Sequence, residues 1–402
     1  MLEIKADPKN KSKLVLILLA ANFYNDPRVR QEAESLIKAG FTVHVFCWDR
    51  EGEAEDTNID NKLIVRTMKI LTSKEFNKLK YAVAAILLQI LGFFYGIKLI
   101  RKYRKIIVHA NDFNTLLAAY LLKMFFRKRV RVVYDCHELT PNVYKDWYGT
   151  LVGKVAEKLE KLLIKCADVV LTVSEPVASY LRTITNAPVY VFYNYPSEKY
   201  IPMIDKMEAR EILGLPKDKF IVAFVGNIRP DIAVGELVEA AEILKKRNLG
   251  DKIRFVIVGG GASKDEVWNL VKEKNLEDIV LLVPRVPRDK AILYLCAADV
   301  SYILFKGDNL RTTLGWKLFE SLACGTKVMV CKDTYTAEFL KHIDYPRIVV
   351  NEISPDEIAK ALEKELENKH PSDDRRNRRA EFLWESQEDK FKYIYENLMK
   401  NF

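Results

Sequence analysis

Short apolar runs alternate with amphipathic helical patterns along most of the 402-residue chain. In the first half these runs predict seven strands, at Leu14–Ala20, Thr42–Phe46, Ile64–Met68, Ile106–His109, Val130–Asp135, Val169–Val173 and Val189–Phe192. Helical patterns such as Val29–Ala39 and Val155–Cys166 lie between them. This alternation is typical of a doubly wound parallel sheet covered by helices.

A break in the pattern divides the chain. Residues 195–219 contain three prolines and one glycine among polar residues, which predicts a hinge. A second series follows, with strands expected at Phe220–Val225, Arg254–Val258, Ile279–Leu282, Val300–Ile303 and Lys327–Val330. We therefore predict an α/β fold of two Rossmann-like, doubly wound parallel-sheet domains, residues 1–195 and 196–379, and a last helix in residues 380–402.

Composition narrows the class of protein. Apolar residues make up 49% of the chain and charged residues 30%, as in globular proteins. Six scattered cysteines without metal-binding spacing, and no signal-peptide pattern, predict a cytoplasmic protein. Residues 1–200 carry 31 Lys and Arg against 21 Asp and Glu, whereas residues 201–402 carry 33 against 34. The excess positive charge of the first half therefore predicts an anionic partner, either nucleic acid or an anionic membrane surface.

One segment favours a membrane surface over nucleic acid as this partner. Lys78–Lys105 holds 17 uncharged residues, Tyr81–Ile97, between basic ends, and Lys123–Arg131 adds five basic residues without an acid. A 17-residue helix of roughly 26 Å is shorter than the ~30 Å hydrocarbon core. A span would also separate two strands of one sheet. We expect a helix that lies in the membrane interface, with a long buried helix as the alternative. No nucleic-acid-binding motif is visible, so no nucleic acid is expected.

The second half contains a candidate anion site. Lys317 and Glu320 lie three residues apart in the first turns of a predicted helix, which ends at Gly325 before a short strand. Free N–H groups and the helix dipole attract anions there. A lysine suits a diphosphate, and a glutamate suits ribose hydroxyls. The alternative is an ordinary amphipathic helix with one surface salt bridge.

This stretch resembles the retaining GT-B glycosyltransferases of the family 4-like, group 1 type, which carry a Lys-x-x-Glu…Ala-x-Gly helix. Four other segments occur in the family's order, and they are Asp26–Val29, Asp135–Glu138, Val173–Glu175 and the helix around Trp384. The resemblance implies two domains facing a central cleft, with the last helix packing on the first domain. It also implies a nucleotide-diphosphate sugar as the donor, retention of configuration, and neither metal nor cofactor.

The resemblance and the strand ends together give candidate site residues. The catalytic candidates are His137, Lys317 and Glu320. The donor-binding candidates are Gly226, Asn227, Arg229, Gly259, Gly260, Arg285, Val286, Thr312, Thr313, Leu314 and Gly315. The acceptor-binding candidates are Asp26, Arg28 and Asp112. Asp26 and Asp112 can instead cap helices, and His137 can be structural.

The chain departs from the family's pattern at three positions. Asn227 and Val234 stand where the family usually has Arg and Lys, and Thr312 stands where many relatives have a Glu. Arg229 can supply the missing positive charge together with Lys317. We predict a cytoplasmic hexosyltransferase, peripherally bound to the membrane, with a lipid-linked or glycan acceptor. Two alternatives stay open: a nucleotide-sugar 2-epimerase using His137 and Glu138, and a membrane-docking binding protein that has lost catalysis.

Overall fold

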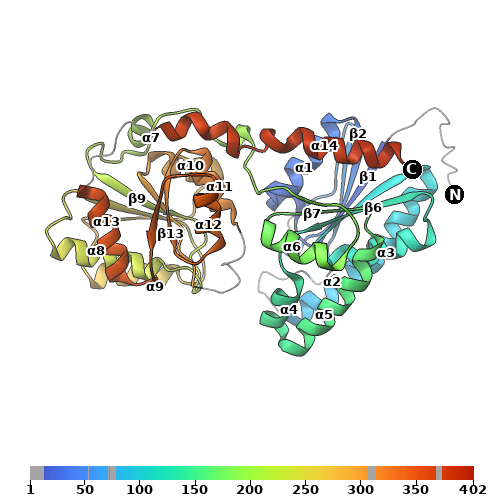
Figure 1. The fold of residues 1–402 in the computed structure, drawn as a ribbon, viewed down its shortest axis with the longest axis horizontal. Coiled ribbons are helices and arrows are strands. Elements are labelled where there is room, and N and C mark those ends of the chain that lie inside the picture. Colours follow the sequence, from blue (N-terminus) through green and yellow to red (C-terminus); the bar gives the residue numbers. More distant parts are fainter. Residues whose placement is uncertain (1–12, 53, 71, 73–77, 307–313, 368–373) are drawn as a thin grey trace. The chain divides into compact units, whose positions relative to one another are not determined.

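The computed structural model describes residues 13–52, 54–70, 72, 78–306, 314–367 and 374–402. The chain folds into two compact units, each built around one sheet (Figure 1). Unit 1 consists of Met1–Tyr193 with Gln387–Phe402, and unit 2 consists of Asn194–Ser386. The predicted boundaries lay at 195/196 and 379/380.

Unit 1 contains an eight-stranded sheet in the order β3-β4-β2-β1-β5-β6-β7-β8. All neighbours are parallel except β3 and β4. The strands are β1 Lys13–Leu19, β2 Phe41–Trp48, β3 Thr57–Ile59, β4 Leu63–Met68, β5 Ile106–Asn111, β6 Val130–Cys136, β7 Val169–Thr172 and β8 Val189–Val191. The seven predicted strands are confirmed. Strand β3 was missed because its three residues form an exposed edge without an apolar run.

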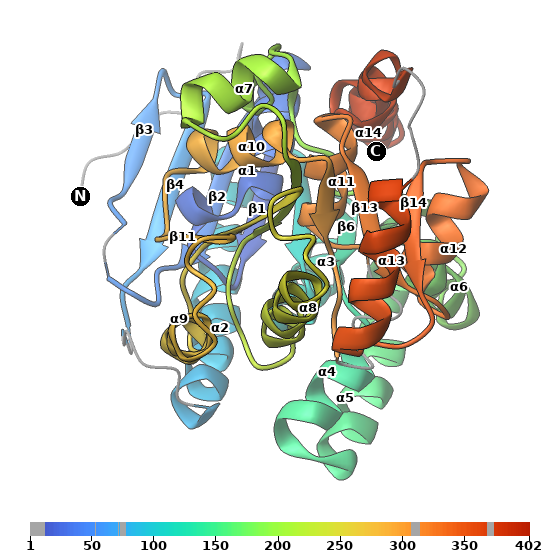
Figure 2. The same cartoon turned by 90° about the vertical axis from the view of Figure 1, so that its left-hand side faces the viewer.

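The helices of unit 1 flank this sheet (Figure 2). They are α1 Pro27–Lys38, α2 Lys78–Lys102, α3 Phe113–Phe125, α4 Thr140–Tyr148, α5 Thr150–Leu163, α6 Glu175–Ile184 and most of α14 Glu385–Lys400. Helix α14 packs on α1, where Glu388 accepts hydrogen bonds from Ser35 (2.8 Å) and Lys38 (3.0 Å). Its Phe391 and Tyr395 are fully buried. The last helix is therefore part of the core of unit 1.

Unit 2 contains a six-stranded parallel sheet in the order β11-β10-β9-β12-β13-β14. Its strands are β9 Phe220–Val225, β10 Ile253–Val258, β11 Val280–Val283, β12 Val300–Tyr302, β13 Lys327–Cys331 and β14 Arg347–Val350. Its helices are α7 Lys206–Leu213, α8 Val234–Lys246, α9 Lys264–Glu273, α10 Arg288–Ala297, α11 Trp316–Ala323, α12 Tyr335–His342 and α13 Pro355–Glu367. The prediction missed β14, and a 3₁₀ helix at Asp374–Phe382 precedes α14. The predicted class of two α/β parallel-sheet domains is confirmed.

Helix α2 lies on the unit 1 sheet through a stripe of small residues. A Cβ at Gly92 would stand 3.2 Å from Leu18 Cδ2, and one at Gly96 would stand 2.5 Å from Leu122 Cδ1. These glycines allow a close approach to β1 and α3. The other side of α2 is exposed and apolar, at Leu79, Val83, Ile86, Ile90 and Phe94. By length and composition alone, α2 is the one helix among the described residues that could cross a membrane.

Candidate functional site

The carboxyl edge of the unit 2 sheet carries two glycine turns that touch each other. Gly226 follows β9 and Gly259 follows β10, with φ values of 146° and 153°. A Cβ at Gly259 would stand 1.9 Å from the Gly226 carbonyl oxygen, so only glycine fits. Strand β9 has β10 on one side and β12 on the other, which is where such sheets open a ligand crevice.

Lys317 reaches this turn from the first turn of α11. Its Nζ lies 4.3 Å from the centroid of the Phe224 ring and would be 2.5 Å from a Cβ at Gly226. No described residue accepts a hydrogen bond from this Nζ. Burial, together with the nearby Arg229 charge, lowers the pKa of Lys317 to about 8. A buried ammonium without an anion is costly, so the site is suited to an anionic ligand.

Glu320 is held by a residue that the sequence analysis missed. Arg288 donates to Glu320 Oε1 from Nη2 (2.8 Å) and Nε (3.1 Å). The Arg288 guanidinium lies over the rings of Tyr200 (4.6 Å) and Trp316 (5.0 Å). Burial raises the pKa of Glu320, whereas Arg288 opposes this rise. Glu320 is therefore oriented by α10, and the alternative of a simple surface helix does not describe these residues.

The other donor candidates lie at the same edge of unit 2. Asn227 and Arg229 are exposed after β9, and Arg229 Nε donates to Asp231 (2.9 Å). A Cβ at Gly260 would be 3.7 Å from Arg285 Cβ, which brings the β10 and β11 turns together.

Two donor candidates belong to the start of α11 and its approach. Gly315 is the exposed N-cap of α11, and Leu314 before it is buried. Val286 is half-buried after β11. Thr312 and Thr313 lie outside the described residues. The edge therefore combines Lys317 with the free N–H groups of a helix start.

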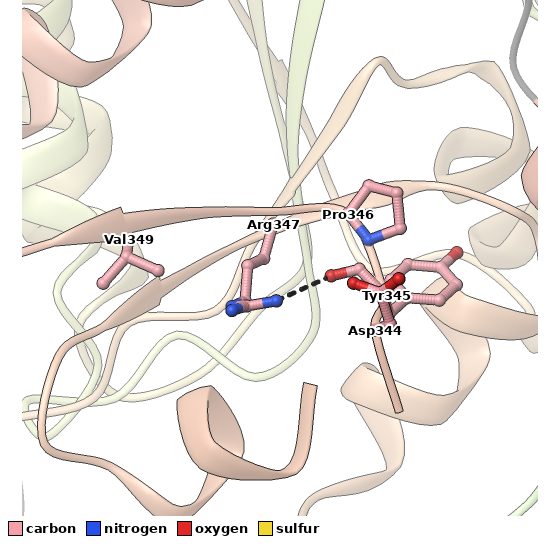
Figure 3. A pocket seen from close by; sticks show the side chains of 5 residues that line it. All are labelled: Asp344, Tyr345, Pro346, Arg347 and Val349. Carbon is pink, nitrogen blue, oxygen red and sulfur yellow. Dashed lines mark hydrogen bonds between the residues drawn. The ribbon is translucent and has the colours of Figure 1, made fainter. Parts of the chain in front are cut away.

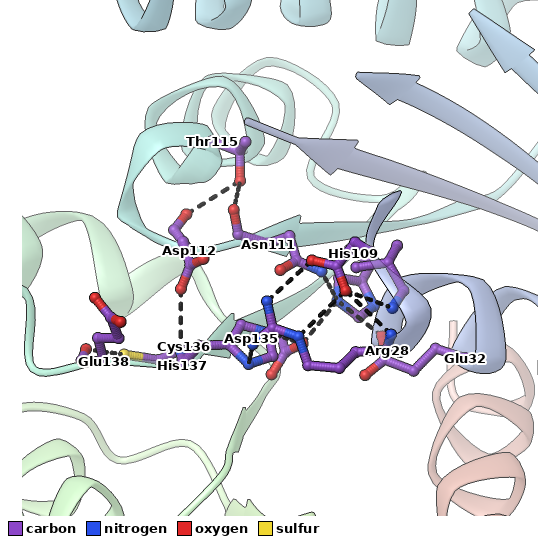
Figure 4. A network of polar contacts seen from close by, with 12 residues as sticks. Arg28, Glu32, His109, Asn111, Asp112, Thr115, Asp135, Cys136, His137 and Glu138 are labelled. Atoms are coloured by element: carbon purple, nitrogen blue, oxygen red, sulfur yellow. Dashed lines mark hydrogen bonds and ion pairs between the residues drawn. The ribbon is translucent and has the colours of Figure 1, made fainter. Parts of the chain in front are cut away.

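Unit 1 carries a polar network at the carboxyl edge of its own sheet (Figure 4). Asp26 caps α1 by accepting from the Arg28 N–H (3.0 Å), so its predicted cap role is confirmed. The Arg28 side chain donates to both Asp26 oxygens, at 3.2 and 2.9 Å. Arg28 Nη1 also lies 2.8 Å from His137 Nδ1. The structure thus joins Arg28 and His137, which the sequence analysis had assigned to separate roles.

Neighbours on both sides fix His137. Its Nε2 is 2.9 Å from Asp135 Oδ2, and its backbone N–H donates to Asp112 Oδ1 (3.0 Å). Because a guanidinium can only donate, Arg28 requires a lone pair on Nδ1, and the ring is neutral in this arrangement. Burial and Arg28 lower the pKa of His137, but Asp135 and Asp112 raise it above its ordinary value. Departure of Arg28 would remove one of the two causes that lower this pKa.

Asp112 has a different role from the predicted helix cap. Its side chain makes no capping hydrogen bond to α3 and instead holds the His137 backbone. Its φ of 61° is a left-handed conformation that few residues other than glycine adopt. The alternative that Asp112 caps α3 with its side chain is therefore wrong.

Three buried groups behind His137 could in principle hold a metal ion. Glu32, His109 and Asp135 each offer one ligand atom, and these atoms lie within 4.8 Å of one another. His109 Nε2 is 3.4 Å from Asp135 Oδ2 and 3.7 Å from Glu32 Oε2. Glu32 Oε2 and Asp135 Oδ2 accept no hydrogen bond within the described part of the chain, and three such side chains near one another do not by themselves establish a metal site.

A cavity of about 220 Å³ lies beside Asp26 at the ends of β1 and β2. Its polar lining includes Asn22, Asn25, Arg50 and Glu51. Tyr81 of α2 completes the wall, so the cavity connects α2 with the start of α1. A second pocket, beside β14, is lined by Asp344, Tyr345, Pro346, Arg347 and Val349 (Figure 3). It lies at the amino edge of that sheet and contains no predicted site residue.

Comparisons with known proteins agree with this architecture. Residues 205–382 match the family model for glycosyl transferases group 1, and residues 28–195 match the model for glycosyltransferase family 4. Together these matches follow the two units closely. The chain belongs to the GT-B glycosyltransferases of the family 4-like, group 1 type, so the predicted family is confirmed.

Individual relatives are distant. An uncharacterised glycosyltransferase of Methanocaldococcus jannaschii is 25% identical over 303 residues, which cover 71% of this chain and 73% of that protein. A D-inositol 3-phosphate glycosyltransferase of Corynebacterium aurimucosum is 26% identical over 236 residues, 56% of this chain and 54% of that protein. The chain thus spans about half the length of this second relative.

Solved structures support the fold. The sucrose-phosphate synthase of Thermosynechococcus elongatus matches with a TM-score of 0.76 and 20% identity, over 97% of this chain and 100% of that chain. The Anabaena protein HepE, in complex with UDP and glucose, matches with a TM-score of 0.64 and 15% identity, over 96% of this chain and 100% of that chain. At these identities the similarity establishes the fold alone.

The glycine contact gives a stability prediction. We expect Gly259→Ala to lower the free energy of unfolding by about 2 kcal/mol or more, because the new Cβ meets the Gly226 carbonyl at a backbone angle that alanine rarely adopts. Gly235→Ala in α8 is the control, since no atom lies within 4 Å of its Cβ position. It should raise stability by roughly 0.5–1 kcal/mol. Urea denaturation measures both, and equal effects would contradict the packed-turn interpretation.

Proposed function

We propose that the chain transfers a hexose from a nucleotide-diphosphate sugar to a hydroxyl group of a phosphate-bearing, lipid-linked or glycan acceptor. Lys317 carries the proposal, because its buried ammonium lacks an anionic partner among the described residues and adjoins a glycine turn. Unit 2 binds the donor and unit 1 binds the acceptor. A protein of similar fold supports the donor class, since its structure is a complex with UDP and glucose.

The proposed chemistry is a retaining transfer. The bond between the sugar C1 and the diphosphate oxygen breaks, and a bond from the acceptor oxygen to C1 forms on the same face. The acceptor proton passes to the departing diphosphate. Lys317, Arg229 and the N–H groups at the start of α11 stabilise the charge that develops on the leaving group. We propose that these groups suffice without a metal or cofactor.

His137 and Glu320 have positioning roles in this proposal. Glu320, oriented by Arg288, binds the ribose hydroxyls of the donor. His137 contacts the reacting sugar once Arg28 has moved from Nδ1 to an anionic group of the acceptor. Acceptor binding and release of His137 are therefore one event. D-inositol 3-phosphate glycosyltransferases among the relatives support an acceptor phosphate at Arg28.

We further propose that unit 1 docks on an anionic membrane surface. The exposed residues Leu79, Val83, Ile86, Ile90 and Phe94 recur every three or four positions, so they form one apolar stripe along α2. Lys98, Arg101 and Lys102 are exposed at its end. Apolar side chains with basic flanks are typical of helices that lie in the membrane interface.

The second basic segment predicted to bind the membrane, Lys123–Arg131, contributes less exposed charge than expected. In the segment Lys123–Arg131, Lys123 pairs with Asp168 (2.7 Å), and Arg129 donates to the Tyr103 carbonyl at the end of α2 (2.9 Å). Their charges are thus used inside the unit, and Arg127 and Lys128 stay exposed. The prediction missed an exposed apolar stripe on α5, formed by Leu151, Val155, Leu159 and Leu162.

Two cavities border helix α2. A groove of about 630 Å³ beside the α2 stripe combines Leu91 and Phe94 with Lys69 and Lys98, which suits an acyl chain below an anionic headgroup. Tyr81, near the start of the same helix, lines the cavity at Asp26. A lipid-linked acceptor could therefore reach Arg28 from the surface that carries α2.

Two substitutions test the donor site. We expect Lys317→Met and Glu320→Gln each to lower turnover by about 10²–10³, because each removes one preorganised group. Lys341→Met, the same change at an exposed lysine, should leave turnover unchanged. The assay is nucleoside-diphosphate release from UDP-, GDP- and ADP-hexoses. Near-normal rates in both variants would rule out this site. A changed sugar without acceptor would instead support the epimerase, and absence of nucleotide binding would support a binding protein.

The pKa of Lys317 predicts a pH dependence. Below pH 8 the ammonium is charged and binds a diphosphate, and above pH 8 it loses its proton. We expect the Kd of the tightest-binding nucleoside diphosphate to rise by up to about tenfold per pH unit above 8. Lys317→Met should bind weakly at every pH and show no such rise. Calorimetry from pH 7 to 9.5 measures this, and a flat wild-type profile would contradict it.

Flotation with lipid vesicles tests the docking surface. Ile86→Glu places a charge in the middle of the α2 stripe, where the side chain is 60% exposed. We expect it to weaken binding to phosphatidylglycerol vesicles about tenfold, since it removes one apolar side chain that would be buried in the lipid on docking. Ile212→Glu on α7 of unit 2, at 57% exposure, is the matched control. Equal binding of both variants, or equal wild-type binding to neutral vesicles, would contradict the proposal.

A further inference from the structure

Within unit 1, a row of buried polar side chains leads from the last helix of the chain to His137. Figure 4 shows its members His109, Asp135 and His137. The row runs from Tyr395 of α14 through His109 of β5 and Asp135 of β6. We propose that Tyr395 and His109 are positioning residues that fix the Asp135 carboxylate and thereby orient the His137 ring. The role of His137 at the sugar rests on the proposed function, whereas the row of contacts does not.

The row begins with a buried pair of rings. The Tyr395 hydroxyl lies 2.5 Å from His109 Nδ1, and both side chains are fully buried. Their rings are nearly parallel, with an interplanar angle of 18° and centroids 6.1 Å apart. Burial raises the pKa of Tyr395 well above its ordinary value, so the hydroxyl keeps its proton. A buried phenol needs a hydrogen-bonding partner, and His109 provides it.

Asp135 connects the two histidines through one oxygen atom. Its Oδ2 lies 3.4 Å from His109 Nε2 and 2.9 Å from His137 Nε2. Burial raises the pKa of Asp135, but His137 and His109 lower it below its ordinary value, so the carboxylate stays ionised. Because this oxygen lies within 3.4 Å of a ring nitrogen of both histidines, a change at His109 alters the surroundings of the carboxylate that faces His137.

The other groups around His109 leave Asp135 as the charged carboxylate of the cluster. Glu32 lies 3.7 Å from His109 Nε2, and burial together with the Asp135 charge raises its pKa well above the ordinary value. Burial therefore favours the protonated form of Glu32. Asn111 Nδ2 lies 3.3 Å from the same nitrogen. Strand alternation explains the meeting: His109 and Asn111 share one face of β5, and Asp135 pairs with Asn111 in register.

The row matters most when the acceptor is bound. Arg28 then leaves Nδ1, and Asp135 is left as the partner of the His137 ring. Helix α14, which carries Tyr395, is held on unit 1 by hydrogen bonds. Gln387 donates to the Tyr193 carbonyl (2.6 Å), and Glu388 accepts from Ser35 (2.8 Å). The last helix thus contributes to the reaction through Tyr395, which packs against His109 rather than against His137.

Ring NMR tests the row without any substrate. The chain has five histidines, so the ¹⁵N resonances of His137 and His109 can be assigned with His137→Gln and His109→Gln. Tyr395→Phe keeps the ring and removes the hydroxyl. We expect it to shift the imidazole resonances of both His109 and His137, whereas Tyr393→Phe, on the same helix at 65% exposure, shifts neither. A shift confined to His109, or one bound metal ion per chain by elemental analysis, would overturn the proposal.

Kinetics separate positioning from packing. We expect Tyr395→Phe to lower kcat about tenfold with little change in the donor KM, and to have no further effect in a His137→Gln background. Equal losses in both backgrounds would mean a merely structural role and would overturn the proposal. If the chain shows no transferase activity, the proposed function fails, but the NMR result still decides whether the row exists.

Discussion

The account depends on a lysine ammonium enclosed in protein without an anionic partner among the described residues. Lys317 Nζ rests on the Phe224 ring and against Gly226, and burial holds its pKa near 8. Such a group lowers the stability of the unliganded fold. The same group gains most when a diphosphate arrives, because the desolvation has already occurred. The glycine turns after β9 and β10 supply the space, and the start of α11 supplies N–H donors.

Unit 1 uses a different electrostatic arrangement. Its positive group, Arg28, is already paired with Asp26 and lies against His137. An acceptor must therefore exchange one set of contacts for another, which couples acceptor binding to the state of His137. The two units thus differ in the charge balance of their proposed sites. Lys317 has no anionic partner among the described residues, whereas Arg28 is already paired with Asp26.

Much of the fold could be predicted from the sequence. Buried parallel strands such as Val130–Cys136 are continuous apolar runs, and the strand ends pointed to Gly226, Gly259 and His137. Edge strands were harder to predict: Thr57–Ile59 has no apolar run, and the short run in β14, Arg347–Val350, was overlooked. The motif helix located Lys317 and Glu320 but could not reveal Arg288. That residue is distant in sequence and acts by stacking between two rings. Likewise, Tyr395 meets His109 only through tertiary packing.

The most direct test of the central claim is a crystal structure of the full chain with a bound nucleoside diphosphate. The account predicts that Lys317 Nζ leaves its position over Phe224 and lies within hydrogen-bonding distance of a diphosphate oxygen, with the phosphates at the start of α11. Phosphates bound elsewhere on unit 2, with Lys317 still packed over the Phe224 ring, would contradict it.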